Sequence, residues 1–436
     1  MLPELTVPAS LAELLQACRS CFSVRSFPLF VLLAVGMIGQ VGESTVTGIL
    51  LGSGLQRLVG HDRVHRFFAE HRWCPDQLGL ALAGLIVAKL LAPGAAIPLA
   101  LDDSLFRRRG KKVAHAHLGH DASMPGHHLA RGNRWVILAI IVELPFCSRP
   151  VALPVLMRLW RGKGTASMID LAREMIGVLL RAFPERALQI TADAAYHGGR
   201  LADLPARASI TTRTPRNAVV YAPAPPPTGK RGRPRSKGAR LGTPEHAARL
   251  VPERETRVRR YGRTETVHIR DLRCLWYGAF GKREGRLVAA RDAIGARKGV
   301  LYVFTTDLTA SAEEIVERYA ARWSIEVAIE NAKQIMGVGQ ARNRVPAAVE
   351  RTVPFGMLVM TIVYLWYALH GHDAADIAQR RAAAPWYESK SEPAFSDMLA
   401  KLRRTIIKTR FSRVHAGHQP LAQIDPDLLA WSLTAA

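Results

Sequence analysis

Four residues with chemically useful side chains recur at helical spacing in the stretch YAARWSIEVAIENAK, which contains no helix breaker: Tyr319, Arg322, Glu326 and Lys333. At about 100° per residue, the last three lie within about 60° of Tyr319 around a helix, so all four share one narrow face. Such a polar stripe is most often the solvated side of an amphipathic helix, and Arg322 with Glu326 makes an ordinary i,i+4 ion pair. The same stripe also offers a carboxylate with two cations and a phenol beside it.

Other acids lie at the ends of apolar, strand-like runs of the sequence. Asp102 and Asp103 follow the run AAIPLAL, and Asp193 follows ALQITA. Carboxylate oxygens are the ligands that Mg²⁺ prefers, and phosphoryl transfer commonly uses two metal ions about 3.5 to 4 Å apart. We therefore expect Asp102 or Asp103, Asp193 and Glu326 to bind two Mg²⁺ ions, with Mn²⁺ as a possible substitute.

The elements around these acids predict an α/β core. Apolar runs typical of strands cover 95–104, 133–146, 148–160 and 187–199, and an amphipathic stretch typical of a helix covers 167–183. A further strand-like run, 299–308, precedes one long helix expected over 311–337, which Ser311 opens and Glu313 and Glu314 support in its first turn. We assign 93–225 and 298–370 to this core.

A basic segment interrupts the two parts of the core. Between Thr228 and Cys274 there are fourteen Lys and Arg against five Asp and Glu, in short alternating stretches. We expect a basic β-rich insertion over 226–297. Its first loop contains KRGRPR, which resembles an AT-hook, in which Arg-Gly-Arg-Pro lies in a narrow A·T minor groove. The expected DNA contacts of this loop are Lys230, Arg231, Arg233 and Arg235.

The ends of the chain are predicted to be helical, over 1–92 and 371–436. Short helices with Arg and His on their polar faces suit a DNA-binding bundle, although plain scaffold helices have the same pattern. The five cysteines do not form a disulfide framework, and the spacing of Cys18 and Cys21 from His61 and His65 is too long for a zinc finger.

The charge of the chain indicates its partner. Its 436 residues carry 60 Lys and Arg against 36 Asp and Glu, a net charge of +24. A surface with this excess attracts a polyanion, and we rank nucleic acid above anionic lipid or a merely solvated face. The most apolar window, 27–39, is too short to cross a bilayer, and no secretory cleavage site follows it. We expect a cytoplasmic, nucleoid-associated protein with no membrane partner.

The spacing Y-x2-R-x3-E-x6-K, met by Tyr319, Arg322, Glu326 and Lys333, resembles the signature of the DDE transposases of bacterial insertion sequences. The resemblance implies an RNase H-like core with a β-rich insertion. It also implies that Asp103, which precedes Ser104, forms the catalytic metal-binding triad with Asp193 and Glu326. Alternation along a strand lets only one of two adjacent acids face a site, so Asp102 is the alternative to Asp103, and Glu330 is the alternative third acid.

The same resemblance implies roles for the neighbours of the triad. Tyr319, Arg322 and Lys333 are expected to hold DNA phosphates, and Trp323 either stacks on an unpaired base or packs in the core. The reaction would be cleavage at the transposon ends followed by strand transfer into target DNA. Because both ends must be cut, a homodimer in a synaptic complex on double-stranded DNA is implied.

Two other functions fit part of the pattern. An RNase H-like nuclease for repair or junction resolution explains the acids and the charge, but neither the Tyr319 to Lys333 spacing nor the insertion. A catalytically inactive DNA-binding protein derived from a transposase explains the charge, although all three acids are present.

Overall fold

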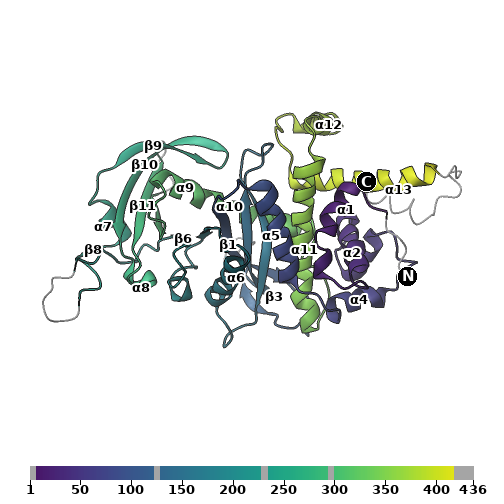
Figure 1. The fold of residues 1–436 in the computed structure, drawn as a ribbon, viewed down its shortest axis with the longest axis horizontal. Helices are drawn as coiled ribbons and strands as arrows, with labels where there is room; N and C mark the ends of the chain where they lie inside the picture. The colour runs from purple at the N-terminus through teal and green to yellow at the C-terminus, as the bar shows by residue number, and fades with distance from the viewer. Residues whose placement is uncertain (1–5, 122–127, 227–233, 293–298, 417–436) are drawn as a thin grey trace.

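A computed structural model of the chain describes residues 6–121, 128–226, 234–292 and 299–416 (Figure 1). Within these residues, ten strands form one mixed sheet and two more form a small pair, β7 Val220–Tyr221 with β8 Arg240–Gly242. The strands of the large sheet are β1 Ile97–Arg107, β2 His117–His120, β3 Leu129–Val142, β4 Val151–Trp160, β5 Leu188–Ala192, β6 Ala208–Arg213, β9 Arg254–Arg260, β10 Arg263–Cys274, β11 Gly285–Asp292 and β12 Leu301–Thr305.

The strand order confirms the expected α/β, RNase H-like core. The large sheet runs β2-β3-β1-β5-β6-β12-β11-β10-β9, and β4 pairs with β3. Strand β1 is antiparallel to β3 and parallel to β5, and β5 is parallel to β6. The five-strand part β4-β3-β1-β5-β6 therefore places Asp102 and Asp103, in the middle of β1, beside the end of β5, which Asp193 follows.

The insertion continues this sheet. Strand β12 pairs with β6 of the core and with β11 of the insertion, and β10 and β9 follow outward. Figure 1 shows β9, β10 and β11 at the left-hand end of the molecule. A two-residue turn at Tyr261 and Gly262 closes the β9–β10 hairpin, with φ of 52° and 79°, which suits the twist of a tight hairpin. Two short helices, α7 Pro244–Ala248 and α8 Tyr277–Phe280, also belong to this region.

Two helices join the insertion to the core. Helix α9 Ala312–Ala321 packs on a satellite cluster that includes Val258, Val288 and Val303 from the insertion end of the sheet. Helix α10 Trp323–Gln334 contacts β1 and β4 of the core. The single long helix predicted over 311–337 is therefore interrupted at Arg322, although Arg322 keeps a helical backbone with φ −52° and ψ −34°.

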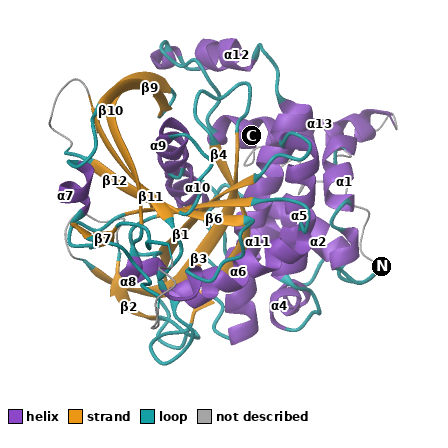
Figure 2. Ribbon diagram, turned by 60° about the vertical axis from the view of Figure 1, so that its left-hand side comes forward, coloured by secondary structure: helices purple, strands orange, loops and turns teal. Residues whose placement is uncertain are grey.

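The remaining helices share the large core, except α12, which buries none of its residues. Helix α11 (Pro346–Trp366) contacts N-terminal helices, β4 and α13 (Phe395–Ala416). Figure 2 shows α11 and α13 packed with α1 (Ala9–Gln16) and α2 (Phe27–Gly39). The Thr361 hydroxyl of α11 donates to the Pro154 carbonyl of β4 at 2.8 Å. These helices are α1 Ala9–Gln16, α2 Phe27–Gly39, α3 Val46–Gly52, α4 His61–Ala69, α5 Pro75–Leu90, α6 Met168–Ala182, α11 Pro346–Trp366, α12 Asp376–Ala383 and α13 Phe395–Ala416.

One segment of the described chain, Pro346–Gly371, is long and apolar enough to cross a membrane by length and composition. In the fold, 83% of its most apolar window is buried inside the protein. Burial against the N-terminal helices, β4 and α13 accounts for that composition, as in the core helix of a globular protein.

Close packing of α5 on β4 gives a stability prediction. A Cβ on Gly79 would lie 1.8 Å from the Val155 carbonyl oxygen, whereas a Cβ on Gly84 of the same helix would meet nothing within 4 Å. We expect Gly79→Ala to lower the free energy of unfolding by about 1–3 kcal/mol through overpacking. Gly84→Ala is the matched control and should be neutral or stabilising by up to about 1 kcal/mol. Urea denaturation of both variants tests this, and equal effects would contradict the close approach.

Candidate active site

Strands β1 and β5 bring two acids together. Their parallel register pairs Leu101 with Ala192, so Asp102 and Asp193 each follow the last pair by one residue. Paired positions on neighbouring strands share a face of the sheet, and alternation places Asp102 and Asp193 on the same one. The Asp193 carboxylate accepts from the Ala195 N–H at 2.8 Å, which fixes the turn at the end of β5.

The face that carries Asp102 meets the helices α9 and α10. Arg322 donates from Nη1 to Oδ2 of Asp102 at 3.0 Å and from Nη2 to Oε1 of Glu326 at 2.7 Å. Lys333 donates from Nζ to the hydroxyl of Ser104, two residues along β1 from Asp102, at 2.7 Å. Three of the four residues in the predicted stripe therefore meet at this part of β1.

Asp103, which the sequence favoured as a metal ligand, lies on the opposite face. In the register of β1, β3 and β4, Asp103 is opposite Val136, and Val136 is opposite Arg158. Directly opposed residues share a face, and Arg158 binds Asp76 of α5 and Glu174 of α6. Strand alternation therefore turns Asp102, and not Asp103, toward Glu326, and the role of Asp103 as a metal ligand stays a prediction.

Asp103 has its own partners, the half-buried Arg134 and the buried Tyr196, which sequence reasoning missed. Its carboxylate accepts from Arg134 Nη1 at 2.6 Å and from the Tyr196 hydroxyl at 3.1 Å, while its backbone N–H donates to Oδ1 of Asp102 at 2.8 Å. Tyr196 follows Asp193 by three residues in DAAY, and this spacing was the one available signal. The pair with Arg134 depends on strand register and has no sequence signal.

The other predicted members of the site are also placed. Tyr319 lies next to Arg322, whose guanidinium carbon is 5.7 Å from the centre of the phenol ring. Glu330, the alternative third acid, is exposed and accepts from Gln334 of its own helix at 3.1 Å. Glu326 is therefore the helix acid that faces β1.

The carboxylates of Asp102, Asp193 and Glu326 do not meet at a common point. Within the described ranges, no group of three or more His, Cys, Asp or Glu side chains is close enough to hold a metal ion. The physical reason is visible at Asp102 and Glu326, because the Arg322 guanidinium lies between them.

Burial governs the electrostatics here. Burial raises the pKa of Asp102 from its ordinary value of 3.8 to about 7, Arg322 opposes this rise, and the charges of Asp193 and Asp103 add to it. Burial also lowers the pKa of Lys333. A single guanidinium thus faces a cluster of acids, and a further cation would relieve the excess negative charge.

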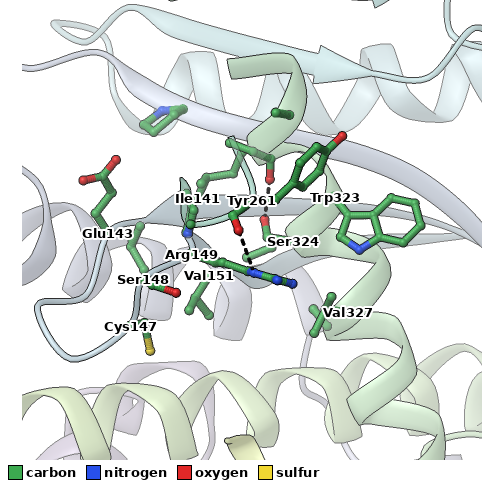
Figure 3. Close-up of a pocket in the computed structure, with 18 of the residues that line it drawn as sticks. Ile141, Glu143, Cys147, Ser148, Arg149, Val151, Tyr261, Trp323, Ser324 and Val327 are labelled. Carbon is green, nitrogen blue, oxygen red and sulfur yellow. Dashed lines mark hydrogen bonds between the residues drawn. The ribbon is translucent and has the colours of Figure 1, made fainter. Parts of the chain in front are cut away.

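A cavity of about 710 Å³ lies beside α10, and its lining includes Trp323, Val327 and the hairpin residue Tyr261 (Figure 3). Trp323 is 48% exposed, so the structure does not bury it as a core residue. Arg149 donates from Nε to the Tyr261 carbonyl at 3.1 Å, which joins the hairpin to the β3–β4 loop.

The AT-hook-like loop is only partly within the described residues. Lys230, Arg231 and Arg233 lie outside them, and Arg235 is exposed. Two residues further along the chain, the Nζ atom of Lys237 lies 4.0 Å from the ring centre of Tyr221 and 4.9 Å from that of Tyr277.

The pKa of Asp102 predicts a pH effect on stability. Because its folded-state pKa of about 7 exceeds its ordinary 3.8, Asp102 stabilises the fold below about pH 4, and this contribution is lost as pH rises through 7. We expect Asp102→Asn to make the free energy of unfolding of the metal-free protein fall less between about pH 4 and 7 than in the wild type. Urea denaturation across this range measures the slope, and an unchanged slope would contradict the shift.

Comparison with known proteins identifies the family of this chain. No curated protein matches the chain. A family model described as DDE superfamily endonuclease matches residues 20–273, which is more than half of the 436 residues. The match includes β1 and β5 with Asp102 and Asp193, and it ends before the helix that carries Glu326. Enzymes of this family act on DNA, carry out a nuclease-type reaction and usually use a divalent metal ion as cofactor. The chain belongs to the DDE superfamily endonucleases.

Proposed function

We propose that this chain is the transposase of an insertion sequence, which cuts DNA at the transposon ends and joins them to target DNA. The observation that carries the proposal is the pairing of Asp102 and Glu326 through Arg322 beside Asp193, on one face of an RNase H-like sheet. The Tyr319 to Lys333 spacing, which is not part of the family match, supports the narrower assignment to insertion sequences.

The residues of this face fit divalent metal ions. Asp102, Asp193 and Glu326 supply carboxylate oxygens, the hard donors that Mg²⁺ and Mn²⁺ prefer. A cation of the chain itself, the Arg322 guanidinium, already lies between two of them. These three side chains would hold two Mg²⁺ ions. When bound, the ions would activate a water molecule, and later a DNA 3′-OH, for in-line attack on a phosphodiester.

The neighbouring side chains would position the DNA. Lys333, held by Ser104, and Tyr319 lie on the same side of β1 as the acids and suit a phosphate near the scissile bond. Trp323 and Tyr261 lie at the cavity beside α10, where Trp323 would stack on an unpaired base. The exposed Arg263 and Arg273, which share a face of β10, would contact the backbone of the duplex.

The biological setting follows from the same proposal. Cutting both ends requires a homodimer in a synaptic complex, and a substrate of this kind places the protein on the nucleoid in the cytoplasm. The contacts with the transposon ends would be divided among four parts of the chain. These are the helices of 1–92, the core of 93–225 with 298–370, the insertion of 226–297 and the C-terminal region of 371–436. A structure-selective nuclease and an inactive DNA-binding protein remain the competing functions.

The first test is cleavage of DNA that carries the terminal inverted repeats, in the presence of Mg²⁺. We expect repeat-specific 3′-OH ends, and a loss of at least about a hundredfold in rate for Asp102→Asn, Asp193→Asn or Glu326→Gln. Asp103→Asn is the matched control and should keep more activity than any of the three. If Asp103→Asn is inactive and Asp102→Asn active, the choice of Asp102 is refuted. Cleavage of branched DNA without repeats favours the nuclease, and binding without cleavage favours the inactive protein.

The role of Trp323 can be tested by binding. Trp323→Ala should weaken affinity for DNA with an unpaired base near its end by about 1–3 kcal/mol, with a smaller loss for fully paired DNA. Val327→Ala, one turn further along α10 and also partly exposed, removes apolar surface without removing a stacking ring. Fluorescence anisotropy measures both variants, and equal losses on the two DNAs would argue against stacking.

A further inference from the structure

The Arg322 side chain forms hydrogen bonds with two acids at once, Asp102 and Glu326. It is 11% exposed, while Asp102 is 16% and Glu326 33% exposed. Its Nη1 and Nη2 hydrogen bonds reach one carboxylate each, and its Nε is buried without a hydrogen-bond partner among the described residues. A phosphate-binding arginine would present these donors to solvent, and this one does not.

The position of Arg322 along the chain explains how it reaches both acids. It lies where α9 ends and α10 begins, and the Ile325 N–H donates to its carbonyl at 3.0 Å in a tightened turn. Helix α9 packs on the insertion strands, and α10 packs on the core. The guanidinium therefore fastens the junction of the two helices to β1, with Glu326 one turn further along α10.

The guanidinium and a divalent ion need the same oxygens. Asp102 already accepts from Arg322 on Oδ2 and from the Asp103 N–H on Oδ1. A divalent ion bound to Asp102 and Glu326 would also have a positive charge as its immediate neighbour, and like charges repel strongly in a buried site.

We propose that Arg322 is an internal counterion that positions Asp102 and Glu326 in the metal-free protein and has to leave them when a divalent ion binds. This rests on the proposed function, because it takes these acids as metal ligands. Arg322 is then a positioning residue in the metal-free protein. Once displaced it gains free N–H donors, so that its release would couple metal binding to the capture of a DNA phosphate.

The first experiment is calorimetric titration of the metal-free, full-length protein with Mn²⁺. Arg322→Gln should bind Mn²⁺ about tenfold more tightly than the wild type, because a competing charge-assisted contact is removed. Arg134→Gln is the matched control, since it removes a half-buried arginine that binds Asp103 on the other face of the sheet, and it should give no gain.

The outcomes separate the two proposals. Equal or weaker Mn²⁺ binding by Arg322→Gln, or the same gain in Arg134→Gln, overturns the counterion role while leaving the metal site intact. Binding that persists unchanged in an Asp102→Asn, Glu326→Gln double variant, or that is absent from wild type and Arg322→Gln alike, refutes the proposed metal site and the counterion role with it.

A second measurement uses the wild-type protein and does not depend on the folding of a variant. Phenylglyoxal modifies accessible guanidinium groups, and mass spectrometry locates the modified residue. Mn²⁺ should raise the modification rate of Arg322 several-fold and leave that of Arg134 unchanged. An Arg322 rate that Mn²⁺ leaves constant overturns the exchange, even if the affinity of Arg322→Gln has risen.

Discussion

One guanidinium between two carboxylates ties the junction of α9 and α10 to the central strand β1. Arg322 joins β1 through Asp102 and α10 through Glu326, and no other hydrogen bond from a described side chain links these two acids. Removing one member of a buried ion pair commonly costs about 3–5 kcal/mol, because the remaining charge is left without a partner. Burial is the main cause of the raised pKa of Asp102, Arg322 opposes the rise, and the charges of Asp193 and Asp103 add to it.

The two faces of β1 bind different sets of side chains. On one face Asp102 and Ser104 meet Arg322 and Lys333, and on the other Asp103 meets Arg134 and Tyr196. The second set also serves the first, because the Asp103 N–H donates to Asp102 and Tyr196 belongs to the turn that follows Asp193. Neighbouring acids in a sequence can thus hold different roles that only the sheet distinguishes.

The sequence predicted what depends on local pattern. The long apolar runs predicted β3 and β4, and Ser311 marked the start of α9. Strand β6 was missed because its Thr-rich sequence is not an apolar run, and β2 because four residues are too few for a pattern. The choice between Asp102 and Asp103 needed the register with β3, and the break at Arg322 depends on tertiary contacts rather than on helix propensity.

The strands of the insertion continue the core sheet, because β11 pairs with β12 and β12 pairs with β6. The tip of its hairpin returns to the core, where Arg149 binds the Tyr261 carbonyl and Arg259 donates to the Ser148 carbonyl at 3.2 Å. Glu392, just before α13, also accepts from the Ser148 hydroxyl at 2.7 Å. Since the hairpin is held at both ends, its basic surface and the cavity beside Trp323 keep a fixed relation to Glu326. A duplex bound along the insertion would therefore meet the acids at one defined phosphate, which is what cleavage at a single position requires.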